Sequence, residues 1–503
     1  MSGIKIPDAG GDSITLLKVD GHLYPKSPVD SQVDAIRGIR DLPVREDDVF
    51  ICAYPKCGTH WVWEMVRLLL LEDTETVIRK EKLMLEFFGK DVLENFPSPR
   101  VLNTHCLVEQ LPRGVFEKKC KIIYILRNPK DMAVSFFHHH TKLPKIYEYD
   151  GKWENHLSLL MDGKVDFGSF FTYLKDWAAV GKTHPEVPTL TLVYEDLKED
   201  PLAGIRKVAK FLNVEKSEEF YLKVKELTSF NKMKERKGGL VATPDGSPVM
   251  YRKGEVGDWK NYFTVAQNEA FDRLYKENMA GCDINFRYTL KFLHNLSDLC
   301  DVCEISMTNN KKDDESGVKM SLIKIPDAGG ESITYLKVDG HLFARASVDS
   351  QADVIRGIRD LPVREDDVYI CAYPKCVDSG SFTTYLKDWA AIGTNHPEVP
   401  TLTLVYEDLK EDPLAGIRKL AKFLNAEKSE EFYLKVKELT SFNKMKEKKG
   451  SLVTAPDGSP VMYRKGEVGD WKNYFTVAQN EAFDRLYMEN MAGCDINFRY
   501  SLK

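Results

Sequence analysis

The stretch DDVFICAYPKCGTHWVWEMVRLLLLED, residues 47–73, decides the fold class of this 503-residue chain. Its first part, Asp47 to Tyr54, is a short apolar and β-branched run that follows charged residues, which is typical of a buried parallel strand. A loop with Pro, Lys and Gly follows, and apolar residues then recur at helical spacing. The segment therefore predicts a strand, a loop and a helix in succession.

Two further segments repeat this pattern. CKIIYIL, residues 120–126, is a second apolar run and precedes RNPKD and a helical pattern. PTLTLVY, residues 188–194, is a third, and the Asp and Pro after it mark the capped start of a helix. Strands that alternate with helices predict an α/β fold, a parallel sheet flanked by helices on both faces. In such folds ligands bind beyond the carboxyl ends of the strands.

Composition and charge exclude several classes of function. With 71 basic and 77 acidic residues the net charge is −6, so the broad basic surface of a nucleic-acid-binding protein is absent. No apolar run approaches the roughly 20 residues of a membrane span, and the first residues contain no apolar signal segment. The ten cysteines are then expected to be reduced thiols. We therefore expect a cytoplasmic protein that has neither a membrane nor a nucleic-acid partner.

The chain contains a second, shorter copy of itself. IKIPDAGG at Ile4 returns at Ile323, and the match stops after Cys57 and Cys376 before it resumes through both C-terminal parts. We interpret this as a tandem duplication fused into one reading frame, whether in the cell or in the prediction of the gene. The predicted organisation is a complete domain over 1–291, a linker over 292–321, and a truncated repeat over 322–503 that lacks the counterpart of 58–164.

The loop YPKCGTHW, residues 54–61, has the features of an anion site. It lies between a predicted strand and a helix N-terminus, where free backbone N–H groups and the helix dipole favour a phosphate. Gly58 allows close approach of the backbone, and Lys56 supplies a positive charge. The lysine precedes the glycine, so this is not the Walker pattern. Taken alone, the loop is also compatible with an ordinary turn that carries an exposed lysine.

The loop belongs to a series of seven blocks that resembles the cytosolic sulfotransferases. The resemblance covers essentially all of residues 1–291 and part of 322–503. It implies a P-loop-like parallel sheet and the transfer of a sulfuryl group from 3′-phosphoadenylyl sulfate (PAPS) to a hydroxyl or amine of a small molecule, without a metal. The blocks are YPKCGTHW at Tyr54, Thr104-His105, LRNPKDMAVS at Leu126, YED at Tyr194, TSF at Thr228, YRKGEVGDWK at Tyr251 and KNYFTVAQNE at Lys260.

The resemblance also implies roles for individual residues. His105 would be the general base that removes the proton of the acceptor, and Lys56 would hold the leaving phosphate. The implied PAPS-binding residues are Lys56, Cys57, Gly58, Thr59 and His60 at the 5′-phosphosulfate, Trp61 on the adenine, Arg127 and Ser135 at the 3′-phosphate, Tyr194, Thr228 and Phe230 on the adenine side, and Arg252, Lys253 and Gly254 in a loop that closes on the 3′-phosphate.

One departure affects the catalytic block. The family usually reads K-T-H there, whereas Asn103 precedes Thr104 and His105 in this chain. Asn103 can still donate a hydrogen bond near the bridging oxygen, but the loss of an ionised donor costs about 1–3 kcal/mol. Two functions therefore stay open: a PAPS-dependent sulfotransferase and a non-catalytic protein that binds PAPS or its product 3′-phosphoadenosine 5′-phosphate (PAP).

The acceptor pocket and the contacts between chains are predicted from the remaining segments. Phe87, Phe88, Phe137 and His139 match segments that line the acceptor cavity of the family, although each phenylalanine is equally compatible with a core position. The three consecutive residues His138 to His140 point in different directions on a helix, so we expect no metal site. The segment Lys260–Glu269 matches the dimer segment of the family. Alternatively, the second copy docks on the first through Lys472–Glu481.

The second copy is predicted to be inactive. It lacks counterparts of Gly58, His105 and Arg127, although it keeps Lys375, Tyr406, Thr440, Phe442, Arg464 and Lys465. It also lacks the strand CKIIYIL, so it should expose apolar surface.

Overall fold

The computed structural model divides into two units, which we describe separately. The first comprises Met1–Ser297 with Phe475–Ala478, and the second comprises Asp298–Tyr474 with Gln479–Lys503. The structure describes residues 3–27, 31–241, 243, 246, 248–282, 284, 286–289, 320–326, 332–338, 341–344, 370, 382–450, 463 and 465–494. Most of the predicted linker lies outside these residues, as do Lys375 and Arg464.

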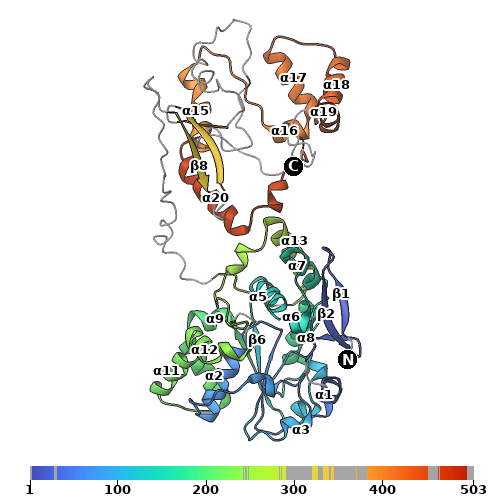
Figure 1. Ribbon diagram of the computed structural model, residues 1–503, viewed down its shortest axis with the longest axis vertical. Helices are drawn as coiled ribbons and strands as arrows, with labels where there is room; N and C mark the ends of the chain where they lie inside the picture. The colour runs from blue at the N-terminus through green and yellow to red at the C-terminus, as the bar shows by residue number, and fades with distance from the viewer. Residues whose placement is uncertain are drawn as a thin grey trace. The chain divides into compact units, whose positions relative to one another are not determined.

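A four-stranded parallel sheet forms the centre of the first unit (Figure 1). The strand order is β5 (Val101–Thr104), β4 (Val49–Ala53), β6 (Lys121–Leu126) and β7 (Thr189–Val193). All residues of β4 and β5 are buried, as their apolar character predicts. The predicted α/β fold with a parallel sheet is confirmed, and the carboxyl ends of all four strands lie at one edge.

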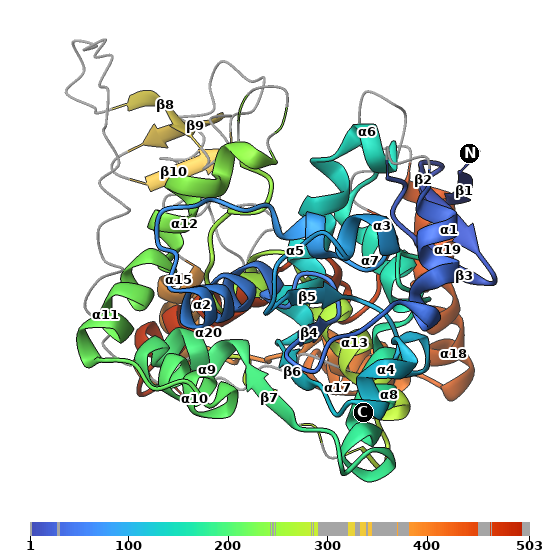
Figure 2. The ribbon, with the colours of Figure 1, turned by 90° about the horizontal axis from the view of Figure 1, so that it is seen from below.

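Helices cover both faces of this sheet (Figure 2). Helix α2 (Thr59–Leu71), which follows β4, packs with α10 (Pro201–Leu212) on one face. On the other face lies α8 (Phe170–Thr183), whose Trp177 stacks on Tyr124 of β6 at 5.1 Å between ring centroids. The helices α5 (Pro129–Thr141) and α9 (Tyr194–Glu199) begin directly after β6 and β7. Each crossover therefore starts at the edge where the strands end.

The first unit also contains an antiparallel sheet that sequence reasoning missed. Its strands are β1 (Ile4–Pro7), β2 (Ser13–Val19) and β3 (His22–Tyr24). The turn between β2 and β3 contains Asp20 and Gly21, both with positive φ. An Asp-Gly pair between apolar runs is a strong hairpin signal, so the sequence did carry the information.

The remaining elements of the first unit are short or lie at its periphery. They are α1 (Gln32–Gly38), η1 (Ile39–Asp41), η2 (Lys80–Leu83), α3 (Lys90–Leu93), η3 (Val108–Gln110), α4 (Arg113–Glu117), α6 (Pro144–Tyr147), α7 (Trp153–Met161), α11 (Glu218–Leu227), α12 (Phe230–Lys237), η4 (Gly238–Leu240), η5 (Asp258–Asn261) and α13 (Val265–Asn278). Among the residues that the structure describes, no helix has both the length and the apolar character to cross a membrane.

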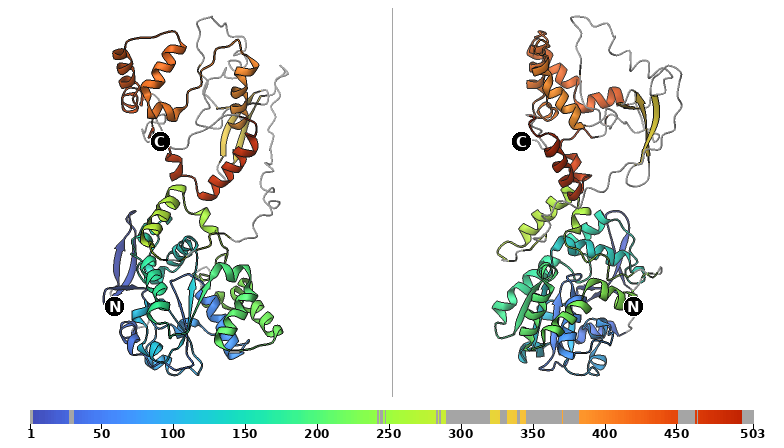
Figure 3. Two further views of the ribbon diagram at one scale, coloured as in Figure 1. Left: turned by 180° about the vertical axis from the view of Figure 1, so that it is seen from behind. Right: turned by 90° about the vertical axis from the view of Figure 1, so that its left-hand side faces the viewer.

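The second copy repeats elements of the first without its core. Its strands β8 (Met320–Pro326), β9 (Ser332–Val338) and β10 (His341–Ala344) form an antiparallel sheet. Helices α17, α18 and α19 form one cluster (Figure 3). The helices are α15 (Phe382–Asn395), α16 (Tyr406–Glu411), α17 (Pro413–Phe423), α18 (Glu430–Leu439), α19 (Phe442–Lys449), η8 (Asp470–Asn473) and α20 (Val477–Asn490).

Two helices of nearly the same sequence show what the second copy lacks. In α10, five residues are buried, and Val208 is 0% exposed. In its counterpart α17 no residue is buried, and Leu420, which matches Val208, is 39% exposed. The second copy exposes apolar surface, as predicted; at this helix the absent packing partner is the counterpart of α2.

Candidate active site

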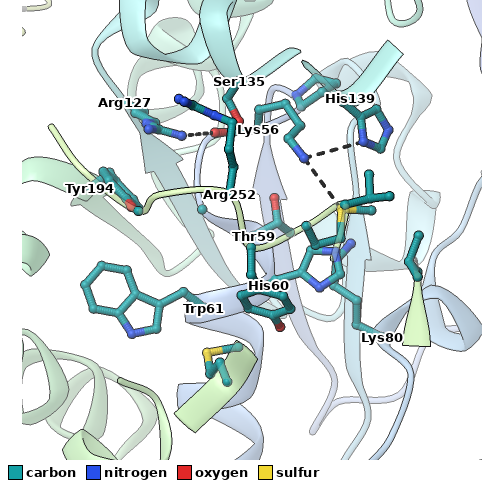
Figure 4. A pocket seen from close by; sticks show the side chains of 18 of the residues that line it. Lys56, Thr59, His60, Trp61, Lys80, Arg127, Ser135, His139, Tyr194 and Arg252 are labelled. Carbon is teal, nitrogen blue, oxygen red and sulfur yellow. Dashed lines mark hydrogen bonds between the residues drawn. The ribbon is translucent and has the colours of Figure 1, made fainter. Parts of the chain in front are cut away.

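A cavity of about 660 Å³ lies at the carboxyl edge of the parallel sheet. Residues that follow each of the four strands line it. They are His105 after β5, and Lys56 after β4, Arg127 after β6 and Tyr194 after β7 (Figure 4). The strand ends converge because all four run in the same direction. The site therefore lies where an α/β fold places its ligands.

The loop between β4 and α2 requires a glycine at position 58. Gly58 caps α2 with a φ of 101°, in the left-handed region. A Cβ there would lie 2.7 Å from the ring of Tyr194. The loop also holds Lys56 at a φ of 66°. The N-terminus of the 13-residue helix α2 thus faces the cavity with its backbone close to the place where an anion would bind.

Five buried polar atoms of residues that line the cavity have no hydrogen-bond partner among the described residues. They are Oγ1 of Thr59, Nε1 of Trp61, Nε of Arg127, the hydroxyl of Tyr251 and Oε1 of Glu81. A buried polar group without a partner is costly, and native structures rarely leave one unexplained. Two of the five atoms are N–H donors, two are hydroxyls that can donate, and the fifth is a carboxylate oxygen, which accepts. The donor set therefore fits a ligand rich in acceptor oxygens, such as a nucleotide with several phosphates.

Basic side chains cluster on the same cavity. Arg127 donates to the carbonyl oxygen of Lys56 at 2.8 Å, and its guanidinium lies 4.4 Å from the centre of the Tyr194 ring. Burial is the main cause that lowers the pKa of Lys56 to about 7, and the charges of Arg127 and Lys80 contribute to the same shift. Because an anion would favour the protonated lysine, the site is electrostatically poised for a negative ligand.

The basic loop with Arg252 and Lys253, which follows η4, is held by two aspartates that sequence reasoning missed. Asp258 pairs with Arg252 and Lys253, each at 2.7 Å. Asp131, on α5, accepts the backbone N–H of Gly257 at 2.8 Å and that of Trp259 at 3.0 Å. Both aspartates fall in motifs that the resemblance used, within RNPKD and KGEVGDW. Their role could not be read from the sequence because the contacts of Asp131 join segments about 130 residues apart.

His105 has a defined tautomer and faces the cavity. Its Nδ1 lies 2.6 Å from the carbonyl oxygen of Ala53, which can only accept, so Nδ1 carries the proton. The lone pair is then on Nε2. Burial lowers the pKa of His105 to about 3, and the charges of Lys80 and Lys56 act in the same direction. The imidazole is therefore neutral at pH 7 and can accept a proton.

Asn103 does not line the cavity. Its side chain is fully buried beneath the cavity wall and is hydrogen-bonded to Lys80 and Leu83. Lys80 itself lines the cavity. The sequence singled out Asn103 as a member of the catalytic block, whereas the lysine that it contacts carries no motif and was missed.

The cavity gathers most of the other predicted residues. Gly254 has a φ of 68°, and a Cβ there would lie 2.4 Å from the ring of Phe230. Cys57, by contrast, points into the core with 1% exposure. The lining includes Gly58, Thr59, His60, Trp61, Ser135, Thr228, Phe230, Arg252, Lys253 and Gly254.

The predicted acceptor residues divide into two groups. Phe87 and His139 line the cavity, together with Phe167 and Ile146. Phe88 and Phe137 are not part of its lining: Phe88 packs against the core, and the ring of Phe137 lies 5.6 Å from that of Trp153.

The three consecutive histidines take different directions, as their spacing on a helix predicts. His139 Nδ1 lies 3.5 Å from Lys56 Nζ, whereas His140 Nε2 lies 2.7 Å from Asp166 inside the core. Within the described ranges, no cluster of three metal-ligating side chains is found.

Comparisons with known proteins agree with this geometry. A family model described as the sulfotransferase domain matches residues 46–283 and 356–495. Human sulfotransferase 1C2 is 36% identical over 293 residues, which are 55% of this chain and 96% of that protein. Mouse sulfotransferase 1A1 is 38% identical over 271 residues, 50% of this chain and 92% of that protein. The crystal structure of mouse sulfotransferase SULT7A1 complexed with PAP matches with 33% identity and a TM-score of 0.46, over 53% of this chain and 96% of that one. The chain belongs to the sulfotransferase family and contains a second, partial copy of its domain.

Proposed function

We propose that the first copy, residues 1–291, is a PAPS-dependent sulfotransferase that acts on a hydroxyl or amine of a small molecule. The observation that carries this proposal is the orientation of His105. Its Nδ1 is engaged by Ala53, so the basic nitrogen Nε2 is available at a cavity that also holds Lys56. A neutral base beside a cationic anion site is the arrangement that sulfuryl transfer needs.

The residues of the site would divide the nucleotide between two basic regions. Lys56 and the N-terminus of α2, with Thr59, would bind the 5′-phosphosulfate. Arg127, Ser135 and the loop with Arg252 would bind the 3′-phosphate, and Trp61 would stack on the adenine. The unpaired donors of Thr59, Trp61 and Arg127 support this assignment. When bound, PAPS supplies an activated sulfuryl group whose sulfur–oxygen bond to phosphate breaks as the acceptor oxygen bonds to sulfur.

The chain would contribute a proton acceptor and a counter-charge. His105 Nε2 takes the acceptor's proton, and its protonated ring is held by the Ala53 carbonyl. Lys56 stabilises the negative charge that develops on the leaving phosphate. Its lowered pKa rises again beside that phosphate, so that it is protonated when the charge appears.

The acceptor would occupy the apolar side of the cavity. Phe87, Phe167 and Ile146 provide walls suited to a flat phenol or steroid. The segment Lys260–Glu269 is a proposed dimer contact. We also propose a cytoplasmic location.

A transfer assay separates this function from its rival. The full chain is incubated with sulfur-labelled PAPS and a panel of phenols, steroids and amines, and PAP affinity is measured by calorimetry. We expect transfer to at least one acceptor, and replacing His105 with Ala should abolish it while PAP affinity persists. Binding of PAP without transfer to any acceptor would instead support a non-catalytic PAP-binding protein.

A further inference from the structure

Lys80 is a buried cation at the cavity that no motif identifies. It begins η2, is only 5% exposed, and lines the cavity together with Lys56 (Figure 4). Its Nζ donates to Oδ1 of Asn103 at 2.9 Å. Among the described residues, no carboxylate forms an ion pair with this ammonium. Because the amide oxygen is neutral and uses one of three N–H groups, two remain for an anion.

Asn103 holds Lys80 and has no hydrogen left for the cavity. Its Nδ2 donates to the carbonyl oxygen of Lys80 at 2.9 Å and to that of Leu83 at 3.0 Å. Its main-chain oxygen accepts the N–H of Leu85 at 3.1 Å. These bonds fasten the segment 80–85 to β5. Asn103 is therefore a positioning residue that acts through Lys80.

Burial lowers the pKa of Lys80, and the charges of two nearby carboxylates, Glu81 and Glu86, oppose this effect without forming an ion pair with the ammonium. Glu86 accepts from the hydroxyl of Thr104 at 2.7 Å and from the backbone N–H of His105. Glu81 lies 3.4 Å from Nε2 of His60. A buried ammonium whose only hydrogen bond goes to a neutral amide is costly. An anionic ligand at the cavity would add a hydrogen-bonded counter-charge to the attraction of Glu81 and Glu86.

Lys80 acts electrostatically on both groups of the proposed transfer chemistry. Burial is the main cause of the low pKa values of Lys56 and His105, but the charge of Lys80 lowers both. Asn103 and His105 are two residues apart along β5 and its continuation, so their side chains are on the same face of the sheet. The ammonium of Lys80, which is bonded to Asn103, therefore lies beside the strand that leads to the base.

We propose that Lys80 is the second cation of the transfer centre and that its ammonium binds the oxygens of the sulfuryl group during transfer. This inference rests on the proposed function. The positive charge that the family has at the strand position of Asn103 would here be supplied by Lys80, from a turn that packs against that strand. The amide keeps the relocated ammonium in place. Alternatively, the ammonium of Lys80 binds an acidic group of the acceptor, and the experiment distinguishes these two ligands.

The test compares Lys80→Met with the exchanged variant Lys80→Met/Asn103→Lys, both in the full chain. We expect Lys80→Met to lower kcat about 10- to 100-fold with PAP affinity within about threefold of the wild type. The exchanged variant returns an ammonium from the strand and should recover at least about tenfold of this loss. Lys121→Met is the matched control, because Lys121 donates to the Leu212 carbonyl away from the cavity. Its kcat should not change.

A second readout separates a transfer role from a structural one. Removing the charge of Lys80 should raise the pKa of His105, so the acid limb of the kcat profile should move to higher pH. If Lys80→Met does not fold, the kcat of the exchanged variant tests the proposal, because that variant has the positive charge at position 103 and no lysine at position 80. If the wild type transfers the sulfuryl group and folded Lys80→Met has the same kcat, the role of Lys80 is overturned. A folded but inactive exchanged variant would overturn it as well. A rise in KM confined to acidic acceptors would also overturn it. A wild type that binds PAP but transfers to no acceptor would overturn the proposed function itself.

Discussion

At the scale of single residues, the site depends on groups whose charge changes when an anion arrives. Lys56 and His105 both have lowered pKa values because they are buried beside other cations. Both shifts belong to the ligand-free protein, in which no anion offsets the cations. Burial is the largest cause of both shifts, and an anion would raise both pKa values by offsetting the cations, so the cavity couples ligand binding to protonation.

The pKa of His105 should therefore rise when PAP binds. It is about 3 in the ligand-free protein, where burial and the charges of Lys80 and Lys56 outweigh the raising effect of the Ala53 carbonyl. Bound phosphates should favour the protonated ring and raise the pKa by at least about one unit. Imidazole resonances in NMR titrations with and without PAP, assigned with His105→Ala, measure the shift. The resonances of exposed His22 should not respond to PAP. An unchanged His105 pKa in the PAP complex would contradict the proposed position of the phosphates.

The sequence predicted these residues better than it predicted their contacts. Lys56, His105 and Arg127 follow short apolar runs, so their convergence at one edge follows from parallel strands. The role of Asn103 was different, because its substitution suggested a lost charge. The compensating lysine is 23 residues earlier, in a single 3-10 turn without hydrophobic periodicity. Contacts of this kind become visible only in three dimensions.

At the scale of elements, α5 links the phosphate site to the basic loop. It begins after β6, and Asn128 caps it by accepting the N–H of Lys130. Within its first turn, Asp131 accepts two backbone N–H groups from the segment 257–259. The helix that follows Arg127 thus also orders the loop that carries Arg252. Runs of apolar residues predicted β4, β6 and β7, but such side-chain links between elements have no periodic signal.

The substitution Asp131→Asn should loosen this link. A side-chain amide has one acceptor oxygen in place of two, so it cannot receive both N–H groups in the same geometry and leaves one unpaired, at a cost of about 1–3 kcal/mol of folding free energy. The expected result is a lower melting temperature and a severalfold weaker affinity for PAP by calorimetry. Asp176→Asn is the control, because Asp176 accepts the single backbone N–H of Val108, which an amide can still receive. Equal effects of the two substitutions would argue against the link.

At the scale of the whole molecule, two helices of nearly identical sequence differ in how far their apolar side chains are buried. The sequence of α10 builds a core where the parallel sheet is present, and that of α17 leaves its apolar side chains exposed. Local propensity is the same in both, so both form helices with the same Asp-Pro start. Burial depends instead on packing partners such as α2, whose counterpart lies in the segment that the second copy lacks. Helix formation is thus determined by the local sequence, whereas burial of the helix requires the elements against which it packs.

A chain that ends at residue 291 should therefore retain the activity of the full protein. Its cavity is lined by residues of the first unit alone, so we expect kcat/KM within about twofold of the full chain and the same PAP affinity. The isolated segment 322–503 should bind no PAP and should bind the dye ANS through its exposed apolar side chains. Sedimentation of both truncated proteins measures their size. A large loss of activity at 291, or recovery on adding 322–503, would show that the second copy docks on the first and stabilises its site.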